Sequence, residues 1–176
     1  HLACVRLGRA LRQGKRCGEV REGSGGDEIA FDHDLNNISI MEEFMEIIEY
    51  QTYREEEILP LYTSVGWTAY TDAPDVLRRG FAKSLLTLAA YEGETLVGLV
   101  RAVGDGETVV LVQDLLVLPQ HQRLGIGTAL MREMMERFAN VRQFQLLTDD
   151  TEKTLAFYRS LGLHDISSLG CQGFMR

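Results

Sequence analysis

The chain has 176 residues with 45% hydrophobic and 25% charged side chains, which suits one globular domain and leaves little room for a second. Its longest apolar runs, such as "TVVLV", are far too short to span a bilayer, so we expect no membrane association. The formal net charge of −8 argues against nucleic acid as the main partner, because phosphate binding needs Lys and Arg on the contact face. The acidic composition suits a cationic small molecule, or serves solubility alone.

Residues 1–26 differ from the rest, because they are basic, end in Ser and Gly, and show only weak helical spacing. Residues 27–40 are also poorly patterned. We therefore predict a non-core extension over residues 1–40 and a single domain over residues 41–176. Two origins for the extension stay open: a segment added for expression, or a biological leader such as a transit peptide.

The first half of the predicted domain shows alternating strand and helix signals. Residues 45–53 alternate well enough for a strand, and residues 54–66 favour a helix that is bent or ended near Pro60. The segment "GWTAYT" that follows reads as a loop, and a second helix is expected over residues 72–84. Three apolar strands come next, and their predicted ranges are 85–93, 94–106 and 108–119. The third is apolar on both faces and is therefore expected inside a sheet.

The second half continues with a helix whose apolar residues recur every four positions, namely Ile126, Leu130, Met134 and Phe138. A strand is predicted over 143–149, and a helix over 151–163 with Thr151 as its N-cap. A short strand or hairpin is expected to end the chain. The predicted order is β-α-α-β-β-β-α-β-α-β, an α/β (α+β) arrangement with a mixed sheet and one β-α-β crossover.

The stretch "DLLVLPQHQRLGIGTALM", residues 114–131, places two glycines where a helix must begin. An ordinary strand-to-helix turn and a ligand-binding turn both fit this pattern. A dinucleotide-binding fingerprint is excluded because Leu130 stands where its third glycine or alanine belongs, and no GxxxxGK[ST] motif occurs. What remains is a set of main-chain N–H groups at a helix start, a geometry that attracts anions. Glycine lets a pyrophosphate approach such a main chain closely.

Residues 117–131 resemble the acetyl-coenzyme A motif of the GNAT superfamily of N-acetyltransferases, Q/R-x-x-G-x-G/A. Residues 122–127, "QRLGIG", fit it at every specified position, and the V-x-P at Val117–Pro119 is also typical. "LAFYRSLGL" is similar to the second signature of the family, and "VGLVRAVGD" resembles its third strand. The resemblance covers residues 45–176 and implies the GNAT fold with splayed central strands. It also implies transfer of acetyl from acetyl-CoA to a primary amine by direct attack in a ternary complex.

The resemblance assigns roles to particular residues of this chain. Where a bulge splays the fourth strand from the fifth, main-chain groups would pair with the pantetheine arm, and the residues concerned are Leu115, Leu116 and Val117. The pyrophosphate would lie on the amides that open the helix, with help from the Arg123 charge, over Gln122, Arg123, Leu124, Gly125, Ile126, Gly127 and Thr128. Tyr158 would protonate the departing thiolate. A thiol pKa of ~8.5 against ~10 for tyrosine makes that transfer slightly uphill. From spacing alone, Tyr158 would read as helix packing.

An alkylammonium with a pKa of ~10.4 must lose its proton before attack, a deficit of roughly 4–5 kcal/mol at pH 7. Some family members place a Glu on the fifth strand, but "QFQLL" offers no acid, and "TDDTE" stands where some have a cofactor-contacting Asn. Asp114, in an otherwise apolar strand, is our first candidate for base or amine anchor, and a hydrogen-bonded structural role is the alternative. Asp149 and Asp150 are further candidates, for which helix capping is the better interpretation.

Trp67 and Tyr70 are candidates for the acceptor pocket, although they could equally form a hydrophobic lid contact. "SVGWTAYT" and "FYRSLGL" look closest to the small-molecule branch of the family, including arylalkylamine-type enzymes. The alternatives are a non-catalytic CoA-binding sensor, a protein N-acetyltransferase and, more weakly, nucleic-acid association through the basic leader. A homodimer is also considered.

Three widely spaced cysteines give no disulfide or zinc pattern and favour a reducing, cytoplasmic environment: Cys4, Cys17 and Cys171. The four histidines are scattered without metal-ligand spacing, so we expect no metal.

Overall fold

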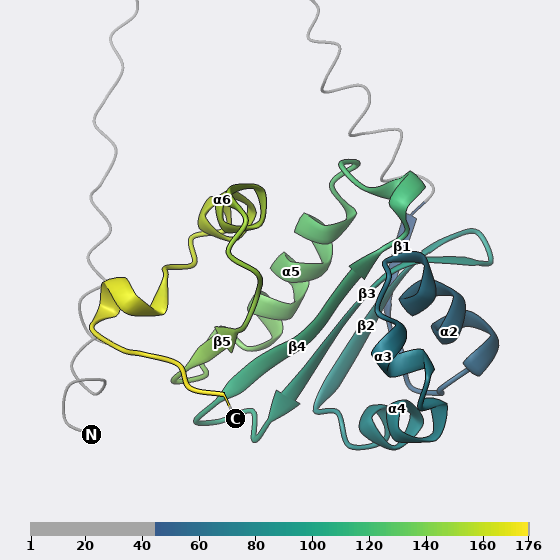
Figure 1. Cartoon of the computed structure of the whole chain (residues 1–176), viewed down its shortest axis with the longest axis horizontal. Helices are drawn as coiled ribbons and strands as arrows, with labels where there is room; N and C mark the ends of the chain where they lie inside the picture. The colour runs from purple at the N-terminus through teal and green to yellow at the C-terminus, as the bar shows by residue number, and fades with distance from the viewer. Residues whose placement is uncertain (1–44, 176) are drawn as a thin grey trace, which may run out of the picture.

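The structure, a computed structural model, describes residues 45–175. The predicted extension over residues 1–40 and the start of the predicted domain lie outside the described residues. Five strands form one sheet in the order β1-β2-β3-β4-β5 (Figure 1). Their bounds are Met45–Glu49 (β1), Leu86–Glu92 (β2), Thr95–Gly104 (β3), Val110–Val117 (β4) and Phe144–Leu146 (β5). The first three pairings are antiparallel, and β4 pairs with β5 in parallel.

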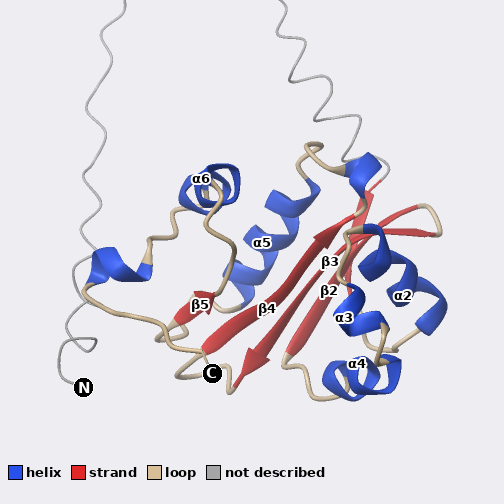
Figure 2. Ribbon diagram, viewed as in Figure 1, coloured by secondary structure: helices blue, strands red, loops and turns tan. Residues whose placement is uncertain are grey.

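The helices cover both faces of the sheet (Figure 2). Three lie on one face: α2 (Glu55–Ser64), α3 (Thr68–Thr71) and α4 (Pro74–Phe81). The other face is covered by α5 (Ile126–Arg137) and α6 (Glu152–Ser160), of which α5 makes the β4-α5-β5 crossover. The mixed α/β fold predicted from the sequence is confirmed.

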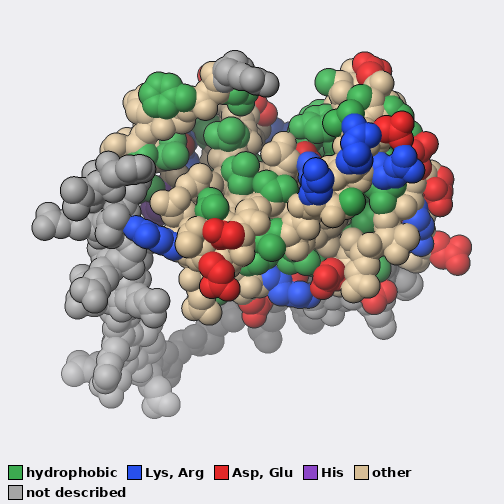
Figure 3. Space-filling model, turned by 90° about the horizontal axis from the view of Figure 1, so that it is seen from below, with side chains coloured by type: hydrophobic (Ala, Val, Ile, Leu, Met, Phe, Trp, Pro, Cys, Tyr) green, Lys and Arg blue, Asp and Glu red, His purple; other side chains and the backbone are tan. Residues whose placement is uncertain are grey.

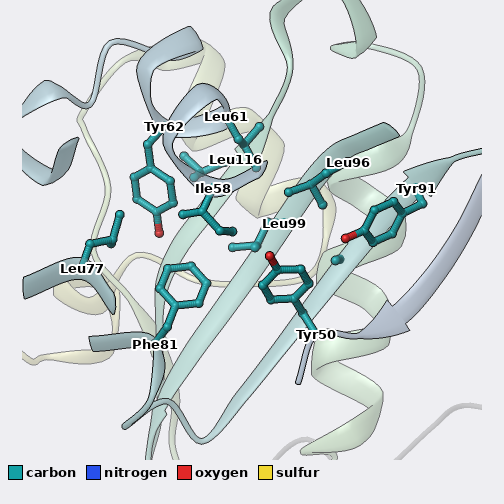
Figure 4. Packing of buried hydrophobic residues seen from close by; sticks show 11 residues of the cluster. Tyr50, Ile58, Leu61, Tyr62, Leu77, Phe81, Tyr91, Leu96, Leu99 and Leu116 are labelled. Atoms are coloured by element: carbon teal, nitrogen blue, oxygen red, sulfur yellow. The ribbon is translucent and has the colours of Figure 1, made fainter. Parts of the chain in front are cut away.

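Alternation along β2 and β3 divides the core into two hydrophobic clusters. Leu96 and Leu99 face α2 and α4, while Val97 and Val100 face α5. From Gly98 to Ala102 the faces of β3 alternate with the two-residue period of a strand that is buried on both sides. The register shift opposite Ala90 and Tyr91 makes Val97 an extra residue, so Leu96 and Leu99 share a face although they are three residues apart. Figure 4 shows the first cluster, where aromatic rings from three elements meet over the sheet.

Gly98 sets the distance between α5 and the sheet. A Cβ at this position would lie 3.0 Å from Ile126 Cγ2 and 3.1 Å from Leu130 Cδ1, tighter than most real Cβ contacts. The absence of a side chain therefore lets the first turns of α5 lie directly on β3. This packing brings the start of α5 beside the end of β4.

Three predictions for the helices of the first half differ from the structure. The helix α2 continues through Pro60 to Ser64, so the alternative that it ends near the proline is wrong. Burial of Ile58, Leu61 and Tyr62 on both sides of the proline stabilises the helix there. The predicted loop "GWTAYT" contains the one-turn helix α3. The helix α4 begins at Pro74 rather than at residue 72, because Ala73 is its N-cap, with a φ of −133° and a ψ of 63° outside the helical region.

The predicted final strand is absent from residues 164–175. A 3₁₀ turn spans Ile166–Leu169 and ends at Gly170, whose φ of 72° favours glycine. The preceding strand β5 is only three residues long and offers little edge for another strand. Within residues 45–175, no helix has the length and hydropathy needed to cross a bilayer.

Candidate active site

A β-bulge interrupts β4 near its middle. Arg101 of β3 pairs with Asp114, whereas its neighbour Ala102 pairs with Val112, so Gln113 is the extra residue. The side chains of Gln113 and Asp114 both reach the helices on the same face: Gln113 Nε2 lies 3.4 Å from the Tyr70 hydroxyl, and Asp114 accepts a hydrogen bond from Tyr62. The bulge thus turns two consecutive side chains of β4 toward α2 and α3.

The pairing of β4 with β5 stops at the bulge. It covers only Val110 to Val112, and Figure 1 shows β5 beside one end of β4. Beyond the bulge, the segment 114–117 has no strand neighbour on its β5 side among residues 45–175. This is the splay between the fourth and fifth strands that the sequence analysis expected.

Main-chain groups of β4 alternate between β3 and the splay. Leu118 donates its N–H to the Val97 carbonyl at 2.9 Å, so by alternation Leu116 also points its main chain at β3. Leu115 and Val117 therefore direct their N–H and C=O groups toward the splay. The Val117 carbonyl accepts a hydrogen bond from Gln122 Nε2 at 3.2 Å. The Leu116 side chain is buried under α2, in the first cluster.

The loop before α5 opens the helix with main-chain amides. Gly125 is the N-cap with a φ of 87°, and no side chain of the described residues caps the helix there. The first helical bond that reaches back to the cap joins Ala129 N–H to the Gly125 carbonyl, so the amides of Ile126, Gly127 and Thr128 point outward. Arg123 has a φ of 65°, a conformation that costs a non-glycine residue about 1 kcal/mol.

Gly127 is not required by the packing of the chain itself. A Cβ there would make ordinary contacts of 3.7 Å with Phe157 and with Val117. The motif accordingly accepts glycine or alanine at this position.

Tyr158 lies on α6, half-buried against the second cluster, with its ring edge-on to Phe157 at 5.0 Å between centroids. Burial raises the pKa of its hydroxyl, the Asp149 carboxylate raises it further, and the Thr148 side chain opposes the change. The phenol therefore stays protonated at neutral pH and can donate a hydrogen bond.

Asp149 caps the turn before α6. Its Oδ1 accepts hydrogen bonds from the Thr151 N–H at 3.0 Å and the Thr151 hydroxyl at 2.7 Å, and these bonds lower its pKa. Thr151 caps α6 in turn through its hydroxyl and the Thr154 N–H, as predicted. The structure thus gives Asp149 the contacts of the capping interpretation.

Asp114 is enclosed. Its Oδ2 accepts hydrogen bonds from the Tyr62 hydroxyl at 2.7 Å and from Arg101 Nε at 2.5 Å, and its side chain has no exposed surface. The other oxygen, Oδ1, is buried without a hydrogen-bond partner among the described residues. These contacts match the structural alternative, and the role of base or amine anchor stays a prediction.

Trp67 and Tyr70 stack on each other at 5.7 Å between ring centroids with a 26° interplanar angle. Tyr70 also lines a cavity of about 290 Å³ between α3, α4 and β3, whose lining residues are Ala69, Tyr70, Ala73, Val76, Leu77, Gly80 and Arg101. Figure 3 views this side of the molecule, with Lys and Arg side chains gathered beside hydrophobic ones over α4. The two predicted pocket residues are therefore neighbours, and one of them lines a cavity.

The model of the acetyltransferase (GNAT) family matches residues 42–163, most of the chain. The chain belongs to this family. The family resemblance seen in the sequence is therefore confirmed. GNAT proteins use acetyl-CoA as the acetyl donor. Within residues 45–175, no cluster of three or more His, Cys, Asp or Glu side chains could hold a metal ion.

Individual GNAT relatives agree with this assignment. A GNAT-family acetyltransferase structure from Streptococcus pneumoniae is 40% identical, with a TM-score of 0.69 over 75% of this chain and 96% of that one. A Gibberella zeae protein named as an acetyltransferase is 36% identical over 72 residues, which is 39% of this chain and 40% of that protein. The structure of AAC(6′)-Iy with a CoA-acetylneamine bisubstrate analogue covers 75% of this chain and 97% of its own at 18% identity, with a TM-score of 0.61, and shows the shared fold.

Sequence reasoning missed the partners of Asp114 in this GNAT domain, Arg101 and Tyr62. The available signal was an arginine inside the apolar strand "LVGLVRAV", since a buried arginine needs a partner. Its partner could not be named because the pairing of β3 with β4 depends on the bulge.

Proposed function

We propose that this GNAT protein transfers acetyl from acetyl-CoA to the primary amine of a small molecule, by direct attack in a ternary complex. One observation carries the proposal: the splayed edge of β4 lies beside a helix start that no side chain of the described residues caps. An extended acyl arm and an anionic pyrophosphate suit these two features.

The end of β4 would hold the acyl arm. Leu115 and Val117 present main-chain groups toward the splay, and Leu116 anchors the strand in the core. The start of α5 would hold the pyrophosphate through the amides of residues 123–128, which glycine leaves without a Cβ at positions 125 and 127. Gln122 supports the loop by bonding the Val117 carbonyl, and Arg123 adds positive charge.

Tyr158 would act on the leaving thiolate. Because burial raises its pKa, the hydroxyl is a weaker acid than an ordinary tyrosine. Its main contribution is then a hydrogen bond to the sulfur as negative charge develops, followed by proton delivery.

The acceptor would enter from the α3 side of the splay. Trp67 and Tyr70 offer a stacked aromatic surface there, and the cavity behind Tyr70 can take an apolar group. Asp114 has no exposed surface, so we propose that the amine loses its proton to water. The rate with subsaturating amine should then rise with pH along the ionisation of the amine itself.

One observation favours the alternative of a CoA-binding sensor. The strand β5, Phe144–Leu146, carries no acid that could accept the proton of the amine. A sensor would bind CoA at the same site and release no thiol.

Free-thiol release from acetyl-CoA with a panel of primary amines tests the proposal. We expect turnover with at least one small amine, and the Tyr158→Phe variant should turn over about a hundredfold more slowly. The matched control is Tyr53→Phe, because the Tyr53 hydroxyl is buried without a hydrogen-bond partner among residues 45–175. CoA binding without thiol release from any amine would favour the sensor, and absence of CoA binding would end the proposal.

A further inference from the structure

A buried polar cluster joins the two sides of the site. It consists of Tyr62 on α2, Arg101 on β3 and Asp114 on β4, and both hydrogen bonds meet at one carboxylate oxygen. Arg101 and Asp114 are 5% and 1% exposed, the two buried charged residues among those described. Burying charges is costly, so a cluster of this kind needs a reason.

The cluster stands at the register shift that makes the bulge. Arg101 and Asp114 face each other across β3 and β4, and the pairing jumps by one residue immediately beyond them. A slip of β4 by one residue would pair Asp114 with another residue and turn its carboxylate toward the opposite, apolar face. The ion pair therefore fixes which residue of β4 is the extra one.

Arg101 also connects the bulge to the helices on this face of the sheet. Its Nη1 lies 3.2 Å from the Ser84 hydroxyl and 3.4 Å from the Gly80 carbonyl, and its guanidinium lies 5.2 Å from the centre of the Phe81 ring. The residues at the end of α4, the body of α2 and both central strands are thus tied to Asp114.

We infer that Arg101 and Asp114 are positioning residues, which hold the bulge and thereby direct the main-chain groups of Leu115 and Val117 at the acyl donor. The inference rests on the proposed function. Asp114 acts through the backbone that follows it and takes no proton from the amine, because an acceptor reaches neither of its enclosed oxygens in this arrangement. The pair specifies the register, and apolar side chains of similar size could match it in stability.

The test uses the double variant Arg101→Met/Asp114→Leu, because each single apolar substitution leaves one buried charge without its partner. The double variant should fold, since it removes both charges together. We expect the KM for acetyl-CoA and the Kd for CoA to rise about tenfold to a hundredfold, with a smaller fall in kcat and an unchanged shape of the pH–rate profile. Hydrogen exchange of the main chain over residues 113–118 should become faster.

The variant Asp114→Asn separates positioning from catalysis. It keeps the shape and the acceptor oxygen, so positioning predicts a modest rise in the KM for acetyl-CoA and the wild-type pH profile. A roughly hundredfold or larger fall in kcat, with unchanged KM, unchanged exchange and an altered pH profile, would make Asp114 the base and overturn the inference.

Glu57→Gln is the matched control, because Glu57 forms a similar Tyr-carboxylate-Arg cluster away from the bulge of β4, beside the separate register shift between β2 and β3. It should leave the KM for acetyl-CoA and the exchange of residues 113–118 unchanged. If residues 113–118 exchange as slowly in the double variant as in the wild type, the cluster contributes only packing, and the inference is overturned. Failure of the wild-type protein to bind CoA would instead refute the proposed function, while the exchange measurement still tests the bulge.

Discussion

Two carboxylates in the described chain use the same chemistry in different surroundings. Asp114 accepts hydrogen bonds from one tyrosine and one arginine through a single oxygen. Glu57 also receives all its bonds at one oxygen, Oε2, from the Tyr50 hydroxyl at 3.0 Å, Arg54 Nε at 3.0 Å and the Tyr91 hydroxyl at 2.9 Å. The first group is the bulge cluster, and the second is the corner cluster where α2 begins beside β1 and β2.

The two clusters differ in their exposure to solvent and in their relation to the strand register. The Arg54 side chain is 46% exposed and that of Arg101 is 7% exposed. Water can replace the lost partner in the corner cluster, whereas the Asp114 carboxylate has no exposed surface and Arg101 meets solvent only along the cavity that it lines. The corner cluster joins α2 to β1 and β2, whose mutual pairing has no register shift, and only its Tyr91 lies beside the separate shift between β2 and β3. Both charged residues of the bulge cluster stand at the shift between β3 and β4. The same set of side chains therefore supports local packing in one place and specifies the backbone in the other.

Removal of each carboxylate is the strongest way to test this contrast. Asp114→Ala leaves the Arg101 guanidinium buried and unpaired, so it should lower the free energy of unfolding by about 3–5 kcal/mol. Glu57→Ala exposes its partners to water and should cost about 1 kcal/mol. Urea denaturation at pH 7 of the two variants and the wild type measures both. Equal losses would show that burial does not distinguish the clusters.

Much of the fold was predictable because its local signals are strong. The apolar runs of β2 and β3, which are buried on both faces, and the four-residue stripe of α5, which is buried on one, are visible in the sequence. The register shift between β2 and β3 leaves no such signal. The start of α5 was also predictable, since two glycines, Gly125 and Gly127, stand directly before the helical stripe in the sequence. The short helix α3 was missed because it depends on packing of Trp67 and Tyr70 against Tyr62, a tertiary contact.

The partners of Asp114 could not be read from the sequence for a related reason. Arg101 and Tyr62 lie 13 and 52 residues away from it. Their meeting depends on the one-residue offset of the bulge, and no residue type in "VQDLL" marks such an offset. An acid in an apolar strand indicates that its carboxylate needs a partner. The sequence does not show whether that partner is a substrate amine or a structural arginine.

Alkaline pH should sharpen the contrast with a smaller effect. Burial raises the pKa of Tyr91 to about 12, and burial together with the Asp114 charge raises that of Tyr62 further. Both phenols are neutral in the folded state, so their stabilisation is complete below about pH 10 and is lost as pH rises through the folded pKa. Between pH 10 and 11, ionisation of Tyr62 on unfolding should cost about 1 kcal/mol.

Urea midpoints from pH 8 to pH 12 measure this loss, with tyrosinate absorbance followed in parallel. Tyr62→Phe and Tyr91→Phe should flatten the decline almost equally up to pH 11, and the two should differ only near pH 12, where Tyr91 ionises in the folded state. A tyrosinate signal from Tyr62 in the still-folded protein would show that the bulge cluster admits water after all.

Added salt should produce the smallest effect, and it should weaken the ion pair of the corner cluster rather than that of the bulge cluster. The Debye length falls to about 3 Å at 1 M ionic strength, so added salt screens exposed charges and leaves buried ones nearly unaffected. Double-mutant cycles would use Arg54→Met with Glu57→Gln, and Arg101→Met with Asp114→Leu, at about 0.05 M and about 1 M NaCl. The coupling of the first pair should vanish in high salt, while that of the second persists. A bulge pair that salt weakens as easily would be a solvated ion pair, and a solvated pair has no means of fixing the register of β4.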